Sequence, residues 1–148
     1  MTEHGDMTGG AAPPIAGVLE TPIYVGDLAR SRAFYEGALG LRPLFADHRL
    51  CALDAGARSV LLLFLRGASD APIRMPGGTI PPHDGAGVLH VAFAVGSAEL
   101  AAWEARLAAR GIAIESEVRW ERGGRSIYFR DPDGHLLELA TPGIWPTY

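Results

Sequence analysis

The chain contains one structural pattern twice, and the two copies are offset by about 70 residues. Each copy begins with a strand-like run, at residues 20–27 and 90–97, and continues into a helical pattern that ends at Gly40 or Gly111. A glycine at this position is typical of a helix C-terminus, because it adopts the left-handed conformation without steric cost. The repeat limits the chain to folds that are built from two similar modules.

The residues around each helical pattern define the rest of the module. Asp27 and Ser97 precede the two helices, and both are suitable N-cap residues. Each helix is followed by three short β-like runs, which lie at 42–47, 50–53 and 59–65 in the first copy and at 112–120, 126–130 and 136–140 in the second. The predicted element order is βαβββ, twice, which places the chain in the α+β class.

A segment of different composition separates the two modules. Residues 67–87 contain nine glycines and prolines among 21 residues, which favours a loop without regular elements. A loop of this length is either a plain linker or a lid over a binding site. His83, near the centre of this loop, points either into such a binding site or only to solvent. The chain length of 148 residues predicts a single domain at 15–148, with modules at about 15–66 and 88–142.

Charge and cysteine content exclude several function classes. The net charge of −4 and the absence of a basic stripe argue against a nucleic-acid partner. No run approaches the roughly 20 apolar residues that span a bilayer, so no membrane segment is expected. The single cysteine, Cys51, lies in an apolar run and cannot form an internal disulfide, which favours a reducing cytoplasm. A buried cysteine usually acts as a small hydrophobic residue, so we do not assign it as a nucleophile.

The first 14 residues lack the pattern of a signal peptide, and we expect them to form a disordered tail. His4 lies in this tail, where it would bind a metal only adventitiously.

Successive side chains of a strand point to opposite faces, and this alternation places three polar residues on the faces opposite the bulky side chains of their own strands. In the run at 88–95 the large apolar residues share one face, and His90 shares the other face with two alanines. By the same alternation, Glu20 in the first module and Glu138 in the last strand lie opposite apolar neighbours. Small residues beside a histidine suit a sheet that curves around a cavity, so these three side chains are expected to face a cleft.

Glu138 interrupts an apolar run, and a buried carboxylate without a partner costs several kcal/mol or takes up a proton. A divalent cation bound by Glu20, His90 and Glu138 would supply the compensation, because carboxylates and imidazole are common metal ligands. Each residue also has an interpretation without metal. Glu20 would be a solvated residue at a strand start, His90 a hydrogen-bonded sheet histidine, and Glu138 an ion-pair partner of Arg125 or Arg130.

Three stretches resemble the vicinal oxygen chelate superfamily, which includes glyoxalase I, type I extradiol dioxygenases, fosfomycin-resistance thiol transferases and bleomycin-resistance proteins. They are VGDLARSRAFYEGALGL, GVLHVAFAV and GRSIYFRDPDGHLLELATP, of which DPDGHLLEL is the most specific. The resemblance covers about residues 16–142 and implies paired βαβββ modules that form a U-shaped open sheet around a cleft. It implies metal ligands at Glu20, His90 and Glu138, and a divalent ion such as Fe²⁺, Mn²⁺, Zn²⁺ or Ni²⁺.

The chain departs from three subfamily patterns. The first ligand position is commonly histidine in the family and is Glu20 here, unlike the two-histidine iron site of extradiol dioxygenases. The last strand of the first module, at 59–65, is apolar where glyoxalase I has a glutamate. No cationic residue follows Glu138 up to the end of the sequence, in contrast to the fosfomycin enzymes. Each departure argues against one specific assignment within the family.

Two function classes follow from these features. In the first, an enzyme uses the ion as a Lewis acid that chelates two neighbouring oxygens of a small substrate. Glu138, Tyr128 and His83 are then the catalytic candidates, the last two for proton transfer or substrate orientation. We favour the enzyme, because a sequestering cleft does not require His90 and Glu138 together.

In the second class, a metal-free protein of the bleomycin-resistance type sequesters an aromatic or peptide-like compound. Trp120 and Trp145 would line its cleft, whereas Trp103 lies on a helix stripe and is assigned to the core. A homodimer is expected in either class, because exposed sheet edges and a shared cleft favour association. In this family the two modules of a site come from one chain or from two.

Overall fold

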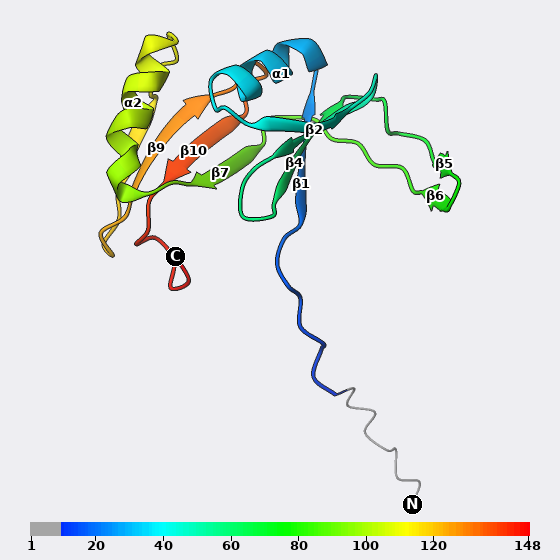
Figure 1. Cartoon of the computed structure of the whole chain (residues 1–148), viewed down its shortest axis with the longest axis horizontal. Helices are drawn as coiled ribbons and strands as arrows, with labels where there is room; N and C mark the ends of the chain where they lie inside the picture. The colour runs from blue at the N-terminus through cyan, green and yellow to red at the C-terminus, as the bar shows by residue number, and fades with distance from the viewer. Residues whose placement is uncertain (1–9) are drawn as a thin grey trace, which may run out of the picture.

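The computed structural model describes residues 10–148. Residues 10–19 are exposed, contain no helix or strand, and lead away from the first strand (Figure 1). Of the tail expected at 1–14, residues 1–9 with His4 lie outside the described residues. Within 10–148, none of the helices has the length and apolar character needed to cross a membrane.

The first module has the predicted order βαβββ. Its elements are β1 (Glu20–Val25), α1 (Leu28–Gly37), β2 (Arg42–Ala46), β3 (Leu50–Asp54) and β4 (Val60–Leu65). The strands form one sheet in the order β1-β4-β3-β2. The first strand of the module is parallel to the last, and the other pairs are antiparallel. The chain therefore returns to pair its end with its beginning.

The second module repeats this topology. Its elements are β7 (His90–Ala94), the short 3₁₀ helix η1 (Ser97–Glu99), α2 (Leu100–Ala109), β8 (Ser116–Arg119), β9 (Arg125–Arg130) and β10 (Leu136–Ala140). The sheet order is β7-β10-β9-β8, again with the first and last strands parallel. The α+β class and the paired βαβββ arrangement are confirmed.

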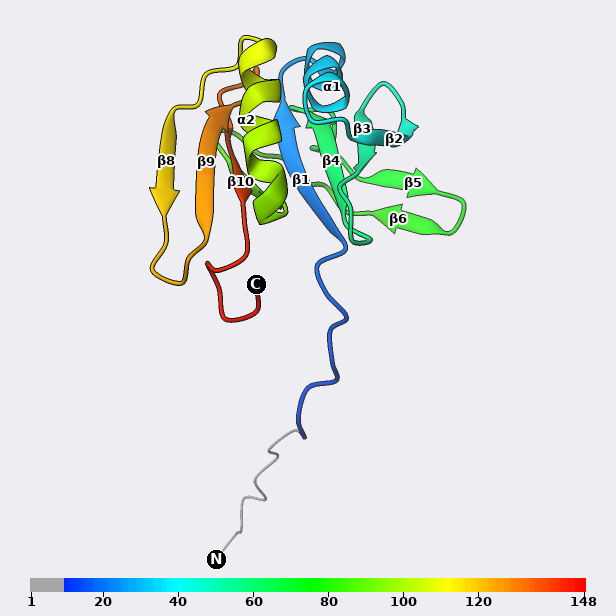
Figure 2. The same ribbon diagram turned by 60° about the vertical axis from the view of Figure 1, so that its left-hand side comes forward.

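The two sheets lie side by side, and both helices cover the same side of them (Figures 1 and 2). Helix residues from both modules pack on the bulky strand faces in one hydrophobic core, which includes Tyr35 and Leu39 from the first module and Leu100 and Leu107 from the second. Burial of this apolar surface is the main force that joins the modules. Within residues 10–148 the opposite faces of the sheets carry no helix, and the open, curled sheets agree with the predicted U shape.

The predicted N-cap is correct for the first helix and wrong for the second, and the helices end at Gly37 and Ala109, shortly before the predicted glycines. Asp27 caps α1 and accepts a hydrogen bond from the main-chain N of Arg30 at 3.0 Å. Ser97 does not cap α2, because it begins η1 and α2 starts three residues later. Gly40 and Gly111 have φ of +68° and +70°, as expected for residues that follow a helix.

The segment at 67–87 contains a regular element that the sequence analysis did not predict. Its residues include a small hairpin of β5 (Ile73–Met75) and β6 (Gly78–Ile80), which projects from the side of the first module (Figure 2). The two ends of the segment are joined, since the Asp84 carboxylate accepts a hydrogen bond from the main-chain N of Gly67 at 3.2 Å. Glycine and proline at the turns masked the two short strands, each of three residues, in the sequence.

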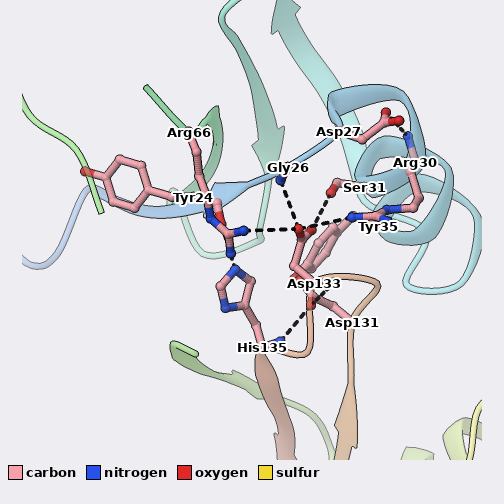
Figure 3. Close-up of polar contacts among 10 residues, drawn as sticks. All are labelled: Tyr24, Gly26, Asp27, Arg30, Ser31, Tyr35, Arg66, Asp131, Asp133 and His135. Atoms are coloured by element: carbon pink, nitrogen blue, oxygen red, sulfur yellow. Dashed lines mark hydrogen bonds and ion pairs between the residues drawn. The ribbon is translucent and has the colours of Figure 1, made fainter. Parts of the chain in front are cut away.

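The DPDGH turn between β9 and β10 joins the two modules (Figure 3). The side chain of Asp131 accepts the hydroxyl of Tyr35 in α1 at 2.7 Å, together with the main-chain N–H groups of Asp133 and His135 at 2.9 and 2.8 Å. His135 is fully buried; its Nδ1 accepts from the main-chain N of Leu89 at 2.9 Å. Its Nε2 therefore carries the proton and donates to the main-chain oxygen of Tyr24 at 2.8 Å.

Asp133 makes a second set of contacts across the same boundary. Its carboxylate accepts from the main-chain N of Gly26 at 2.9 Å, from the Arg30 guanidinium at 3.1 Å and from the Ser31 hydroxyl at 3.2 Å. Arg66 lies 3.9 Å away on the same carboxylate. The family-like motif DPDGH thus binds the second module to the strand-to-helix junction of the first, and it fixes where β10 and its Glu138 lie.

Candidate metal centre in the second module

His90 and Glu138 come together on neighbouring strands. In the parallel pairing of β7 and β10, His90 lies opposite Leu136, and Ala92 opposite Glu138. Both polar side chains point away from the helix-covered core, as strand parity predicts. Nε2 of His90 lies 3.2 Å from Oε1 of Glu138.

The other ring nitrogen of His90 is already engaged. Nδ1 lies 2.8 Å from the main-chain oxygen of Leu136. Because a carbonyl oxygen only accepts, Nδ1 carries a proton and donates it. In the neutral ring the lone pair of Nε2 then points toward Glu138. Histidines that bind metals commonly have this arrangement, with one nitrogen donating to a carbonyl and the other free for the ion.

The second oxygen of Glu138 is held in a similar way. Glu138 is buried, and its Oε2 lies 2.5 Å from the hydroxyl of Ser126. Nε1 of Trp120 donates to the same hydroxyl at 2.9 Å. Since the indole N–H only donates, the Ser126 hydroxyl accepts from Trp120 and gives its own proton to Glu138. This chain of hydrogen bonds orients the carboxylate so that Oε1 faces His90.

Two acceptors that face each other across 3.2 Å require a positive charge. Two chemistries meet this need. A second proton on His90 would make an ion pair, and a divalent cation would be bound by one nitrogen and one oxygen. The donor set fits a metal, because imidazole and carboxylate are both common ligands and each is oriented by its own hydrogen bond.

The two arginines that were considered as partners of Glu138 bind elsewhere. Arg125 pairs with Glu117, and it lies 3.5 Å from Glu104. Arg130 pairs with Glu115 at 2.7 Å. The interpretation of Glu138 as an arginine ion-pair partner is therefore wrong, and the polar side chains that contact its carboxylate are Ser126 and His90.

His90 and Glu138 lie in a cleft of about 560 Å³. Most of its remaining lining is apolar or aromatic, and it includes Ala92, Ala94, Trp120, Tyr128, Ala140, Ile144, Trp145 and Tyr148. A cleft of this size is in the range of small-molecule sites.

Tyr128 is the one catalytic candidate that joins this pair. Its ring stacks on the ring of His90, with centroids 6.4 Å apart. Burial, and then the negative charge of Glu138, raise the pKa of the Tyr128 phenol above its usual range. The phenol therefore keeps its proton near neutral pH and is available as a donor.

Glu20 and His83 do not join His90 and Glu138 within one chain. Glu20 is exposed at the start of β1, and within residues 10–148 no group of three or more metal-ligating side chains occurs. His83 packs on the first sheet, where its Nδ1 lies 2.8 Å from the hydroxyl of Tyr24 and its ring lies edge-on to Phe64. Glu20 and Tyr24 share one face of β1, so both candidates belong to the open face of the first module.

The residues that orient the site were not predicted from the sequence. Ser126 and Trp120 were not assigned as partners of Glu138, and of residues 143–148 only Trp145 was expected to line a cleft. One signal for Ser126 was present, because Ser126 and Tyr128 alternate with the apolar Ile127 and Phe129 and so share a face. Trp103 packs against the core, as predicted.

The chain belongs to the Glyoxalase/Bleomycin resistance protein/Dioxygenase superfamily, whose family model matches residues 15–139. This confirms the resemblance to the vicinal oxygen chelate proteins. The conclusion agrees with the paired modules and with the position of His90 and Glu138 at the first and last strands of one module.

Individual relatives carry related names. The chain is 30% identical over 119 residues to metallothiol transferase FosB of Lysinibacillus sphaericus, covering 79% of this chain and 76% of that protein. It is 46% identical over 54 residues to the FosB of Shouchella clausii, and that match spans only 35% of this chain and 37% of the relative. A crystal structure of lactoylglutathione lyase from Agrobacterium tumefaciens is similar with a TM-score of 0.82 and 32% identity, over 90% of this chain and 99% of that one.

Proposed function

We propose that this chain is a metal-dependent enzyme that acts on a small molecule through two neighbouring oxygens. The observation that supports this most is the pair of facing acceptors, Nε2 of His90 and Oε1 of Glu138, whose other polar atoms are already bonded. The names metallothiol transferase and lactoylglutathione lyase among the relatives are consistent with a metal and a small substrate.

The roles of the residues follow from their contacts. His90 and Glu138 would bind Fe²⁺, Mn²⁺, Zn²⁺ or Ni²⁺, and such an ion would polarise substrate oxygens as a Lewis acid. Ser126 and Trp120 hold the carboxylate in place, and the main-chain oxygen of Leu136 holds the imidazole. Tyr128 would give its proton to a substrate oxygen or orient it. The other walls of the cleft beside these groups are mostly apolar or aromatic.

We further propose a homodimer in which the first module of a second copy completes the site. Glu20 is exposed on the open face of β1 and would be the third ligand, delivered from that copy. His83 is anchored on the same module and would approach the cleft in the same way. A cytoplasmic location is part of the proposal, because Cys51, the single cysteine of the chain, is buried and unpaired.

Metal analysis and calorimetry of protein purified without chelator test the proposal. The wild type should bind about one divalent ion per site, and His90→Ala and Glu138→Ala should each lose it. Glu20→Ala should weaken binding less. His48→Ala, which changes an exposed histidine in the loop between β2 and β3, is the matched control and should bind like the wild type. A wild type that binds no ion at micromolar concentration would contradict the proposal.

A panel of hydroxamates, catechols and α-hydroxycarbonyl compounds tests the chelate chemistry. The metal-loaded protein should bind them at least about tenfold more tightly than the metal-free protein, a difference of about 1.4 kcal/mol. Equal affinity of both forms would favour the second candidate, a metal-free protein that sequesters a compound. That candidate is supported by Trp120 and Trp145, which both line the cleft.

A further inference from the structure

Residues 143–148 form a folded strap that closes one side of the metal-centre cleft. Ile144, Trp145 and Tyr148 of this strap line the same cleft as His90 and Glu138. Trp145 remains 68% exposed, so much of its ring is available for contact. The strap is therefore part of the surface that a bound molecule meets.

Hydrogen bonds fix the strap to the end of the second sheet. The Tyr148 hydroxyl lies 2.8 Å from the main-chain oxygen of Ala140, the last residue of β10, and 3.1 Å from that of Val95, which directly follows β7. Within the strap, the main-chain N–H groups of Gly143, Ile144 and Trp145 all donate to the main-chain oxygen of Tyr148, at 2.9, 3.2 and 3.3 Å. The strap thus closes on itself and holds Trp145 at the rim of the cleft.

Close backbone packing adds a second anchor. The main-chain N of Gly124 donates to the main-chain oxygen of Gly143 at 3.2 Å. A Cβ on Gly124 would lie 2.8 Å from the carbonyl carbon of Gly143, and a Cβ on Gly143 would lie 2.5 Å from the nitrogen of Gly124. Gly143 also has φ of +107°, a conformation that favours glycine. The contact between the strap and the turn before β9 requires glycine on both sides.

The aromatic side chains that line the cleft offer it their rings and few free polar atoms. The indole N–H of Trp120 is used by Ser126, and the hydroxyl of Tyr148 is used by two carbonyls. Among the described residues that line the cleft there is no lysine or arginine. Apart from His90, Glu138 and Tyr128, this surface therefore offers apolar contact and no cation for an anionic group.

We propose that the site selects a substrate with an aromatic or bulky apolar group beside its chelating oxygens, and that Trp145 is the strap residue that contacts this group. This inference rests on the proposed metal-dependent function and names its substrate class. A compound that carries a phosphonate or a second carboxylate in the same position binds poorly, because the side chains that this chain contributes to the lining include no lysine or arginine to replace its lost hydration.

Three hydroxamates that share one chelating head test the proposal by calorimetry on the metal-loaded protein. They are acetohydroxamate, benzohydroxamate and phosphonoacetohydroxamate. Benzohydroxamate should bind at least about tenfold more tightly than acetohydroxamate, and the phosphonate should bind more weakly than acetohydroxamate. Trp145→Ala should reduce the preference for benzohydroxamate over acetohydroxamate by at least about threefold.

The controls separate this inference from the proposed function. Leu44→Ala removes an exposed leucine of β2 in the first module, and it should keep the wild-type preference. If all three compounds bound equally well with and without metal, the proposed function would be contradicted. The ratio of the affinities for benzohydroxamate and acetohydroxamate would still report on the apolar wall of the cleft. Equal binding of benzohydroxamate and acetohydroxamate, a preference for the phosphonate, or an unchanged ratio in Trp145→Ala would overturn the inference even with metal bound.

Discussion

The β9–β10 hairpin carries two polar clusters that differ in how completely their atoms are paired. At its turn, Asp131 accepts from one hydroxyl and two main-chain N–H groups, and both ring nitrogens of His135 are bonded. Along its strands, Ser126 satisfies one oxygen of Glu138, and the other oxygen faces Nε2 of His90. The first cluster is complete within the protein, and the second is completed only by an added positive charge.

This difference separates a structural cluster from a functional one. Within residues 10–148, no buried side-chain nitrogen or oxygen lacks a hydrogen-bond partner. The turn therefore needs no ligand to pair its polar groups, and these groups contribute directly to the stability of the fold. The His90–Glu138 pair is half-open to the cleft, so its free energy depends on what binds there. Substitutions at the turn should mainly lower the stability of the fold. Substitutions of the His90–Glu138 pair should mainly abolish metal binding.

Removal of the Asp131 carboxylate should have the largest effect on stability. Asp131→Ala leaves the buried hydroxyl of Tyr35 and two main-chain N–H groups without their acceptor. We expect a loss of about 3 kcal/mol in the free energy of unfolding, measured by urea denaturation. Asp70→Ala, at an exposed aspartate, should change it by less than about 0.5 kcal/mol. If Asp131→Ala were as stable as the wild type, the turn would not be the contact that stabilises the two modules against each other.

Tyr35→Phe should have a smaller effect that depends on pH. It removes one buried hydrogen bond to a carboxylate, at a cost of about 2 kcal/mol at neutral pH. Burial first, and then the charge of Asp131, raise the pKa of Tyr35 well above its usual range. In the unfolded chain this phenol ionises near pH 10, while in the folded protein it stays protonated. The stabilisation is therefore fully present below about pH 10 and is lost as the pH rises above it.

Denaturation curves between pH 8 and 11 test this dependence. The wild type should lose stability more steeply than Tyr35→Phe above pH 10, and the two proteins should become more alike as the pH rises. Parallel curves across the whole range would show that the phenol is not held protonated by the turn.

Glu138→Gln should have the smallest effect on stability and a complete effect on metal binding. The amide oxygen can accept from Ser126, and the amide N–H can donate to Nε2 of His90, so the facing acceptors are relieved. We expect the metal-free variant to be within about 1 kcal/mol of the wild type, or more stable than it. Glu121→Gln, at an exposed glutamate, should retain metal. A destabilisation as large as that of Asp131→Ala would show that Glu138 serves the fold and not a ligand.

Local patterns in the sequence determined the modules and the faces of their strands. The repeat, the glycines at 40 and 111 and the Asp27 cap predicted the βαβββ order, because each depends on neighbouring residues in the chain. Strand alternation put His90 and Glu138 opposite the core, since the period of two is a property of the extended backbone itself. The same local logic failed for Ser97 and for the β5–β6 hairpin, whose short elements have weak periodicity.

Tertiary packing decided which partners these side chains meet. Side-chain alternation predicted which face of the strand Glu138 occupies. Its contact with Ser126 and His90, and not with Arg125 or Arg130, depended on strand order and on glutamates in and just before β8 that bind the two arginines. The strap at 143–148 reaches the cleft because Gly124 and Gly143 allow two backbones to touch. Such contacts join residues far apart in the chain, and their free energy depends on the shape of the whole fold, which no local pattern contains.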